Sequence, residues 1–446
     1  MSGARAAAEG ADLLVTGIGE LATPLGAEAR RGQAMRDIAT VPDAAILVLG
    51  GEIVYAGPAA GLAPAAAALG LGEGGLAALP SLEAGGRAVV PGFVDSHSHF
   101  VFAGHRADEF LWRAGGLGYM EIHRRGGGIR RSVEATRAAS LERLVELGEK
   151  RLWTMLSLGV TTVEGKSGYG LDKETELRQL EAMGVLAGRV PVEIVPTYLG
   201  PHSVPPEFEG RPGAYVDYVI TEVLPAIRPL APGESLSPSG ETGAPAARFC
   251  DVFCEKGVFE LADSRRYLEA ARARGFGLKL HADEIESLGG AGLAAELGAT
   301  SADHLLKASR PDLERMAAAG VVATCLPLTA FTLRERYAEA RAMIESGCAL
   351  ALASDLNPGS CYSQSIPLVF ALAVLYMGLS VPEALTALTL NGAAALGLAD
   401  RIGSLEPGKL GDLVILDAPS ASFLPYHVGM NLAAAVVKRG EIVYRA

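Results

Sequence analysis

The chain has 446 residues, 49% of them hydrophobic, which is enough material for a large barrel and a smaller second unit. Its 39 Lys and Arg stand against 51 Asp and Glu, and the net charge of −12 argues against nucleic acid or an anionic membrane surface as a partner. No apolar stretch reaches the ~18 residues of a membrane helix, the N-terminus makes a poor signal peptide, and the five cysteines lack a zinc-knuckle spacing. These features predict a cytoplasmic protein with reduced thiols.

Strand-like patterns occur at both ends of the chain. They lie at 12–16, 45–49, 52–56, 412–417 and 441–444. Between them, the Ala-, Gly- and Leu-rich stretch 57–87 predicts a helix and loop. We therefore predict a composite β-sandwich domain built from residues 1–90 and 401–446.

The middle of the chain alternates short apolar strands with helical stretches. The eight predicted strands are 89–94, 160–164, 193–197, 249–253, 278–281, 299–304, 321–326 and 349–354. Eight such units over ~260 residues predict an α/β fold, a (β/α)₈ TIM-like barrel domain spanning 91–400, with a doubly wound open sheet as the competing architecture. The Pro-, Gly- and Ser-rich segment 229–247 predicts a surface insertion.

Histidines follow several of the predicted barrel strands. Five of the eight in the chain do so: His97, His99, His202, His281 and His304. Strand alternation would place His97 and His99 on one face, so that both reach a single cation. Since barrel active sites lie at the carboxyl ends of the strands, these residues predict a catalytic centre.

Three imidazoles and one carboxylate form a donor set that suits zinc or iron and leaves room for a water. The predicted ligands are His97, His99, His281 and Asp355. Such a metal lowers the pKa of its water toward ~7. Asp355 would also accept a proton, His304 would orient the water or stabilise an oxyanion, and Glu284 would pass a proton to a leaving nitrogen.

Simpler interpretations stand beside these roles. His281 and Glu284 could form an i,i+3 pair on a helix surface, Asp355 could cap a helix, and His304 could be a hydrogen-bonded core residue. Lys166 could be a carboxylated bridge between two metals, but a single metal is the better hypothesis because the fourth strand ends in Glu255.

The motifs together resemble the amidohydrolase superfamily and, within it, the imidazolonepropionase family. The matching segments are 91–99, 102–106, 126–129, 164–171, 281–284, 354–360 and 403–409. The Lys-Ser-Gly-Tyr-Gly run at 166–170 is more specific than His-x-His, which marks only the superfamily. Ser96 and Ser98 depart from the family pattern, and neither is expected to bind metal.

The resemblance implies a homodimeric enzyme of histidine degradation that hydrolyses 4-imidazolone-5-propanoate to N-formimidoyl-L-glutamate. It implies the same four metal ligands. It also implies substrate contacts, which by position are Arg106, Tyr119, Tyr169, His202, Glu284, Asn357, Gly359 and Ser360. Arg106 suits the anionic propionate, although it could also be a solvated charge at a helix start. The alternatives are a deaminase of a heterocycle such as guanine, or a barrel that binds without catalysis.

Overall fold

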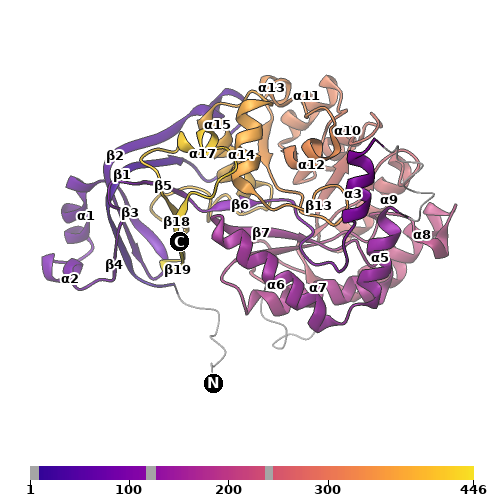
Figure 1. The fold of residues 1–446 in the computed structure, drawn as a ribbon, viewed down its shortest axis with the longest axis horizontal. Coiled ribbons are helices and arrows are strands. Elements are labelled where there is room, and N and C mark those ends of the chain that lie inside the picture. The colour runs from indigo at the N-terminus through magenta and orange to yellow at the C-terminus, as the bar shows by residue number, and fades with distance from the viewer. Residues whose placement is uncertain (1–9, 117–126, 237–244) are drawn as a thin grey trace.

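The computed structural model describes residues 10–116, 127–236 and 245–446. They form two units: a barrel surrounded by helices, on the right of Figure 1, and a second sheet on the left, built from both ends of the chain. The predicted α/β fold with a (β/α)₈ barrel and a smaller β unit is thereby confirmed. The domain boundaries at residues 90 and 400 stay a prediction.

The barrel sheet has eight parallel strands in one path. In spatial order they are β16 (Ala349–Leu352), β15 (Val322–Cys325), β14 (Ser301–His304), β13 (Gly277–Ala282), β11 (Phe249–Cys250), β8 (Glu193–Tyr198), β7 (Val160–Lys166) and β6 (Phe93–Asp95). The short β12 (Phe253–Cys254) pairs with β13. The principal helices outside this sheet are α3 (Ala107–Ala114), α5 (Ile129–Ala138), α6 (Leu141–Ser157), α7 (Lys173–Ala187), α8 (Pro212–Tyr218), α9 (Leu261–Ala273), α10 (Gly290–Leu297), α11 (Arg310–Ala319), α12 (Pro327–Leu333), α13 (Ala340–Glu345), α14 (Ile366–Leu375), α15 (Val381–Leu388) and α16 (Leu390–Ala394).

The segments that follow the first and last barrel strands are joined by hydrogen bonds. Asp355 N donates to His97 O at 2.9 Å, and His99 N donates to Leu356 O at 2.8 Å. Asp95 accepts from the backbone N and the Oγ of Ser354, at 2.9 and 2.6 Å. These bonds close the barrel, and this closure excludes the open-sheet alternative. They also bring into contact two segments that carry predicted ligands, His97 and Asp355, which lie 258 positions apart in the sequence.

The chain ends form one sheet in the order β19 (Glu441–Arg445), β18 (Ala433–Lys438), β17 (Leu413–Leu416), β5 (Ala88–Pro91), β1 (Leu13–Pro24), β2 (Ile38–Leu49) and β3 (Glu52–Pro58), with β4 (Ser81–Glu83) beside β1. Two further backbone bonds join its N-terminal and C-terminal parts, because Ile53 N donates to Lys409 O at 2.7 Å and Ala11 N to Arg439 O at 2.9 Å. Buried Val, Ile and Leu side chains fill the space between them. Helices α1 (Leu62–Ala68) and α2 (Glu73–Ala77) occupy the stretch predicted as helix and loop.

The prediction of one strand over 89–94 was wrong in detail. The run divides at Gly92 into β5, which belongs to the terminal sheet, and β6, which belongs to the barrel. A Cβ at Gly92 would lie 2.2 Å from Thr161 Oγ1, so a side chain there would obstruct the passage between the sheets. Apolar periodicity alone does not reveal such a division.

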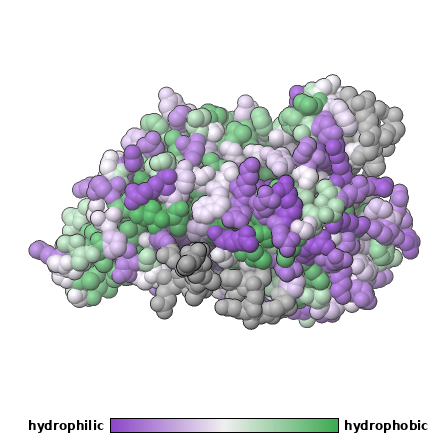
Figure 2. Space-filling view, turned by 60° about the horizontal axis from the view of Figure 1, so that its bottom comes forward, coloured by the Kyte–Doolittle hydropathy of each residue, from purple (hydrophilic) through white to green (hydrophobic). Residues whose placement is uncertain are grey.

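The surface is more polar over the barrel half than over the terminal sheet on the face shown in Figure 2. No helix in the described parts of the chain is long and apolar enough to span a membrane. The predicted insertion is flanked by the short strands β9 (Arg228–Pro229) and β10 (Ala246–Ala247), and residues 237–244 lie outside the described residues.

Candidate metal centre and active site

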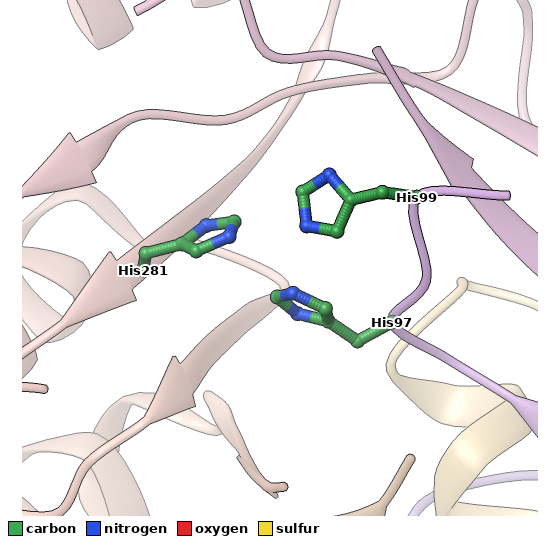
Figure 3. Close-up of side chains that lie close together, drawn as sticks. All are labelled: His97, His99 and His281. Carbon is green, nitrogen blue, oxygen red and sulfur yellow. The ribbon is translucent and has the colours of Figure 1, made fainter. Parts of the chain in front are cut away.

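Three predicted ligands converge at one end of the barrel. Figure 3 shows His97 and His99 on the segment after β6 and His281 near the end of β13, with the three rings facing one another. Their ring centroids are 4.6 Å apart for His97 and His281, 5.4 Å for His97 and His99, and 5.8 Å for His99 and His281. One nitrogen from each ring lies within 4.8 Å of the others, a spacing that suits one ion.

Asp355 completes this group from the segment after β16. Its Oδ1 lies 3.6 Å from His97 Nε2 and 3.7 Å from His99 Nε2, while its Oδ2 accepts a hydrogen bond from Thr329 Oγ1 at 2.6 Å. Burial raises the pKa of Asp355 to about 6, and the Thr329 bond opposes that shift. The carboxylate is therefore ionised at neutral pH and presents one oxygen to the histidines.

The outer nitrogen of each histidine faces a group that fixes the ring. His97 Nδ1 lies 2.6 Å from Asp303 Oδ2, His281 Nδ1 lies 3.1 Å from Asp251 Oδ2, and His99 Nδ1 lies 3.4 Å from Ser167 O. The inner Nε2 atoms of His97 and His281 are buried and find no hydrogen-bond partner among the described residues. Buried orphan nitrogens beside a carboxylate fit a bound metal, which would take their lone pairs.

A buried charge cluster lies beneath the histidines. It consists of Lys166, Lys279, Glu164, Asp251 and Asp303, all fully buried. Lys166 Nζ donates to Asp251 at 2.7 Å and to Glu164 at 3.0 Å, and Lys279 Nζ donates to Glu164 at 2.7 Å. Burial opposes ionisation of Asp303, but Lys279 and Lys166 outweigh it and lower the pKa of this carboxyl. Because the Lys166 ammonium is held in ion pairs, the structure favours one metal over a carboxylated-lysine bridge.

Glu284 and His304 lie beside the ligands. His304 Nδ1 is 3.5 Å from Glu284 Oε1, and the His304 ring centroid is 5.1 Å from that of His281. Burial, reinforced by the charge of Asp355, raises the pKa of Glu284 to about 8. Burial and then His281 lower the pKa of His304 well below its usual value. At neutral pH the site thus holds a protonated carboxyl next to a neutral imidazole.

Two of these site residues have left-handed backbones. Asp355 has φ 51° and His304 has φ 75°, a conformation that costs non-glycine residues about 1–3 kcal/mol each. The residues after β13 are not helical, so His281 and Glu284 do not form the alternative i,i+3 pair on a helix. Strain at strand ends is typical of functional positions.

A cavity of about 900 Å³ opens over this centre. The predicted substrate contacts that line it are Arg106, Tyr169, His202, Glu284, Asn357, Gly359 and Ser360. Tyr119 lies outside the described residues. His202 stacks on His99 with centroids 5.1 Å apart, and the Tyr169 ring lies 5.2 Å from His202.

The loop after Asp355 is shaped around Arg106. Asn357 Oδ1 accepts hydrogen bonds from the backbone N of Gly359 and of Ser360, both at 2.8 Å. A Cβ at Gly359 would lie 1.3 Å from Arg106 Nη2. Glycine at this position therefore lets the guanidinium lie directly against the loop.

Several supporting residues were not predicted. The residues that hold or compensate the predicted ligands are Asp303, Asp251, Lys279 and Thr329. One signal for two of them was present in the sequence: Lys279 stands two residues before His281 in an apolar strand, and Asp303 directly precedes His304. A charged residue within a barrel strand implies a partner inside the barrel.

Comparison with known proteins shows which family the chain belongs to. The amidohydrolase family matches residues 130–444. The imidazolonepropionase of Parabacteroides distasonis is 51% identical over 434 residues, which cover 97% of this chain and 99% of that protein. That of Symbiobacterium thermophilum is 51% identical over 436 residues, covering 97% of each.

Solved structures agree at the level of the fold. A zinc-bound adenosine deaminase from Xanthomonas campestris has a TM-score of 0.65 at 18% identity, covering 97% of this chain and 92% of its own. E. coli guanine deaminase has a TM-score of 0.66 at 15% identity, covering 97% and 99%. At such low identity these neighbours show a shared architecture only.

Replacing Asp303 by Asn should weaken metal binding about 10- to 100-fold, because the amide no longer holds His97 with a charge. Competition with a chromogenic chelator measures this directly, without any substrate. Asp417→Asn, at an exposed carboxylate of the terminal sheet, is the matched control. Unchanged affinity in Asp303→Asn would show that the His97 contact does not support the metal.

Replacing Gly359 by Ala should displace the Arg106 guanidinium, since the new methyl group overlaps it. We expect KM to rise about 10-fold through loss of a charged hydrogen bond, with a smaller effect on kcat. Steady-state kinetics test this, with Gly72→Ala, where the methyl group meets no atom within 4 Å, as control. A fall confined to kcat would contradict the assignment.

Proposed function

Since the chain belongs to the amidohydrolase family and, within it, to the imidazolonepropionases, we propose that it hydrolyses 4-imidazolone-5-propanoate to N-formimidoyl-L-glutamate. The observation that carries the proposal is one cavity lined both by the histidine and carboxylate donors and by Arg106. The donor groups can bind a metal that activates water for hydrolysis, and a guanidinium can bind a carboxylate group of the substrate. This combination matches a cyclic amide that bears a propionate group.

We propose that His97, His99, His281 and Asp355 hold a single ion, either zinc or iron, since both accept three imidazoles and a carboxylate. When bound, such an ion supplies Lewis acidity and lowers the pKa of water toward ~7. Buried, neutral histidines suit this task, because burial lowers the pKa values of His97 and His99 well below the usual range. A ligand must be deprotonated to offer its lone pair.

We assign the proton transfers of the reaction to Asp355 and Glu284, with His304 beside them. Hydrolysis breaks the bond between the ring carbonyl carbon and its nitrogen; the carbon gains a hydroxyl and the nitrogen gains a proton. Asp355, ionised at neutral pH, accepts the proton of the attacking water. His304 orients the water or steadies the oxygen that becomes negative, and Glu284, protonated at neutral pH, donates to the leaving nitrogen.

Recognition of the substrate is assigned to the cavity wall. Arg106 and Tyr169, with Tyr119, hold the propionate, and His202 and Glu284 flank the ring. Asn357, Gly359 and Ser360 supply the loop that supports Arg106. The proposal also includes a homodimer acting in the cytoplasm, with no nucleic-acid partner. Light scattering on the purified protein tests the dimer.

Replacing Arg106 by Ala should raise KM for 4-imidazolone-5-propanoate about 10- to 100-fold, because a buried charged hydrogen bond is lost. Ring opening followed spectroscopically, together with release of N-formimidoyl-L-glutamate, measures both the activity and the effect of the variant. A heterocycle deaminase would behave differently, since a neutral purine needs no carboxylate clamp. Guanine turnover with KM unchanged in Arg106→Ala would replace this proposal by that one.

A further inference from the structure

Three charged residues along α3, from its N-cap to its last turn, lie on the side of the loop that follows Asp355. Arg106, Glu109 and Arg113 are spaced i, i+3 and i+7, which places them on one side of the helix. Arg106 Nε lies 3.4 Å from Pro358 O, and Arg113 Nη2 donates to Gly359 O at 3.2 Å. The two guanidiniums therefore contact adjacent carbonyls of this loop, and all three side chains line the cavity.

Glu109 forms an ion pair with Arg106, but one atom of Glu109 and one of Arg113 lack hydrogen-bond partners among the described residues. It is 5% exposed; its Oε2 lies 3.8 Å from Arg106 Nη1 and accepts from Gly128 N at 3.1 Å. Its Oε1 and Arg113 Nε are both buried, and neither has a hydrogen-bond partner in the described parts of the chain. Unpaired buried donors are costly, so Arg113 Nε points to a ligand that accepts a hydrogen bond.

The charge balance of this trio favours an anion. Two guanidiniums and one carboxylate leave one positive charge uncompensated among the three side chains. Burial, and then the neighbouring charge of Arg106, lower the pKa of Arg113, which reflects the cost of holding two like charges together. A monoanionic group in the cavity would relieve that repulsion.

We propose that Arg113 is a second cationic residue of the subsite for the substrate carboxylate, and that Glu109 is a positioning residue that orients Arg106. This inference rests on the proposed function and adds to it a second determinant of specificity for an anionic substrate. A single guanidinium fixes one edge of a carboxylate, whereas two from different directions also exclude a neutral amide of the same shape. The competing role for Arg113 is purely structural support of the Gly359 carbonyl.

The test compares 4-imidazolone-5-propanoate with its propionamide analogue in the wild type, Arg113→Met and Arg113→Lys. Arg113→Met should lose about 10- to 100-fold in kcat/KM on the carboxylate, mainly through KM, and change less than about 3-fold on the amide. Arg113→Lys should recover part of the loss, because it keeps the charge. Arg130→Met, at an exposed arginine of α5 paired with Glu134, is the control and should keep full discrimination.

Binding provides a second measurement that needs no turnover. Calorimetry with imidazole-4-propanoate and its amide should show the carboxylate preference falling in Arg113→Met, in protein whose melting temperature and metal content match the wild type. Equal losses for acid and amide, in kinetics or in binding, would show that Arg113 only supports the loop and would overturn the inference. A wild type that prefers the acid in binding but does not open the ring would instead refute the proposed function.

Discussion

The site depends on the hydrogen bonds that close the barrel between its first and last strands. Hydrogen bonds from Asp355 N to His97 O and from His99 N to Leu356 O place the two segments that carry the proposed ligands side by side, and the bonds between Ser354 and Asp95 fix their register. The same contacts that complete the barrel therefore assemble the donor set. The left-handed backbone of Asp355 is tolerated because these bonds hold the residue on both sides.

Closure of the barrel also buries several carboxylates, whose negative charges need nearby cations. Lys166 compensates both carboxylates that hold the rings, since its Nζ lies 2.7 Å from Asp251 and 3.5 Å from Asp303. Lys279 pairs with Glu164 at 2.7 Å, and Glu164 also accepts from Lys166. Ion pairs of this kind contribute little net stability, because desolvation offsets their attraction. Their role here is orientation: each ring keeps its outer nitrogen tied to a fixed group and its inner nitrogen toward the centre.

Much of this arrangement was predictable from the sequence. The alternation of strands and helices predicted the barrel, and the side chains after the strands predicted His97, His281 and Asp355 as neighbours. The division of the strand at Gly92 was not predictable, because both halves are equally apolar and only the close approach of Thr161 separates them. Similarly, Thr329 comes from a helix with no local pattern that points to Asp355, and only tertiary packing brings the two together.

The central claim is that one metal ion, held by the histidines and Asp355, carries the hydrolysis. The most direct measurement titrates zinc or ferrous iron into chelator-stripped protein while recording bound metal, circular dichroism and hydrolysis of 4-imidazolone-5-propanoate together. The account predicts a folded, inactive apoprotein whose activity rises linearly to one equivalent, and no such rise in His281→Ala. Full activity in the stripped protein, or a requirement for two equivalents, would contradict it.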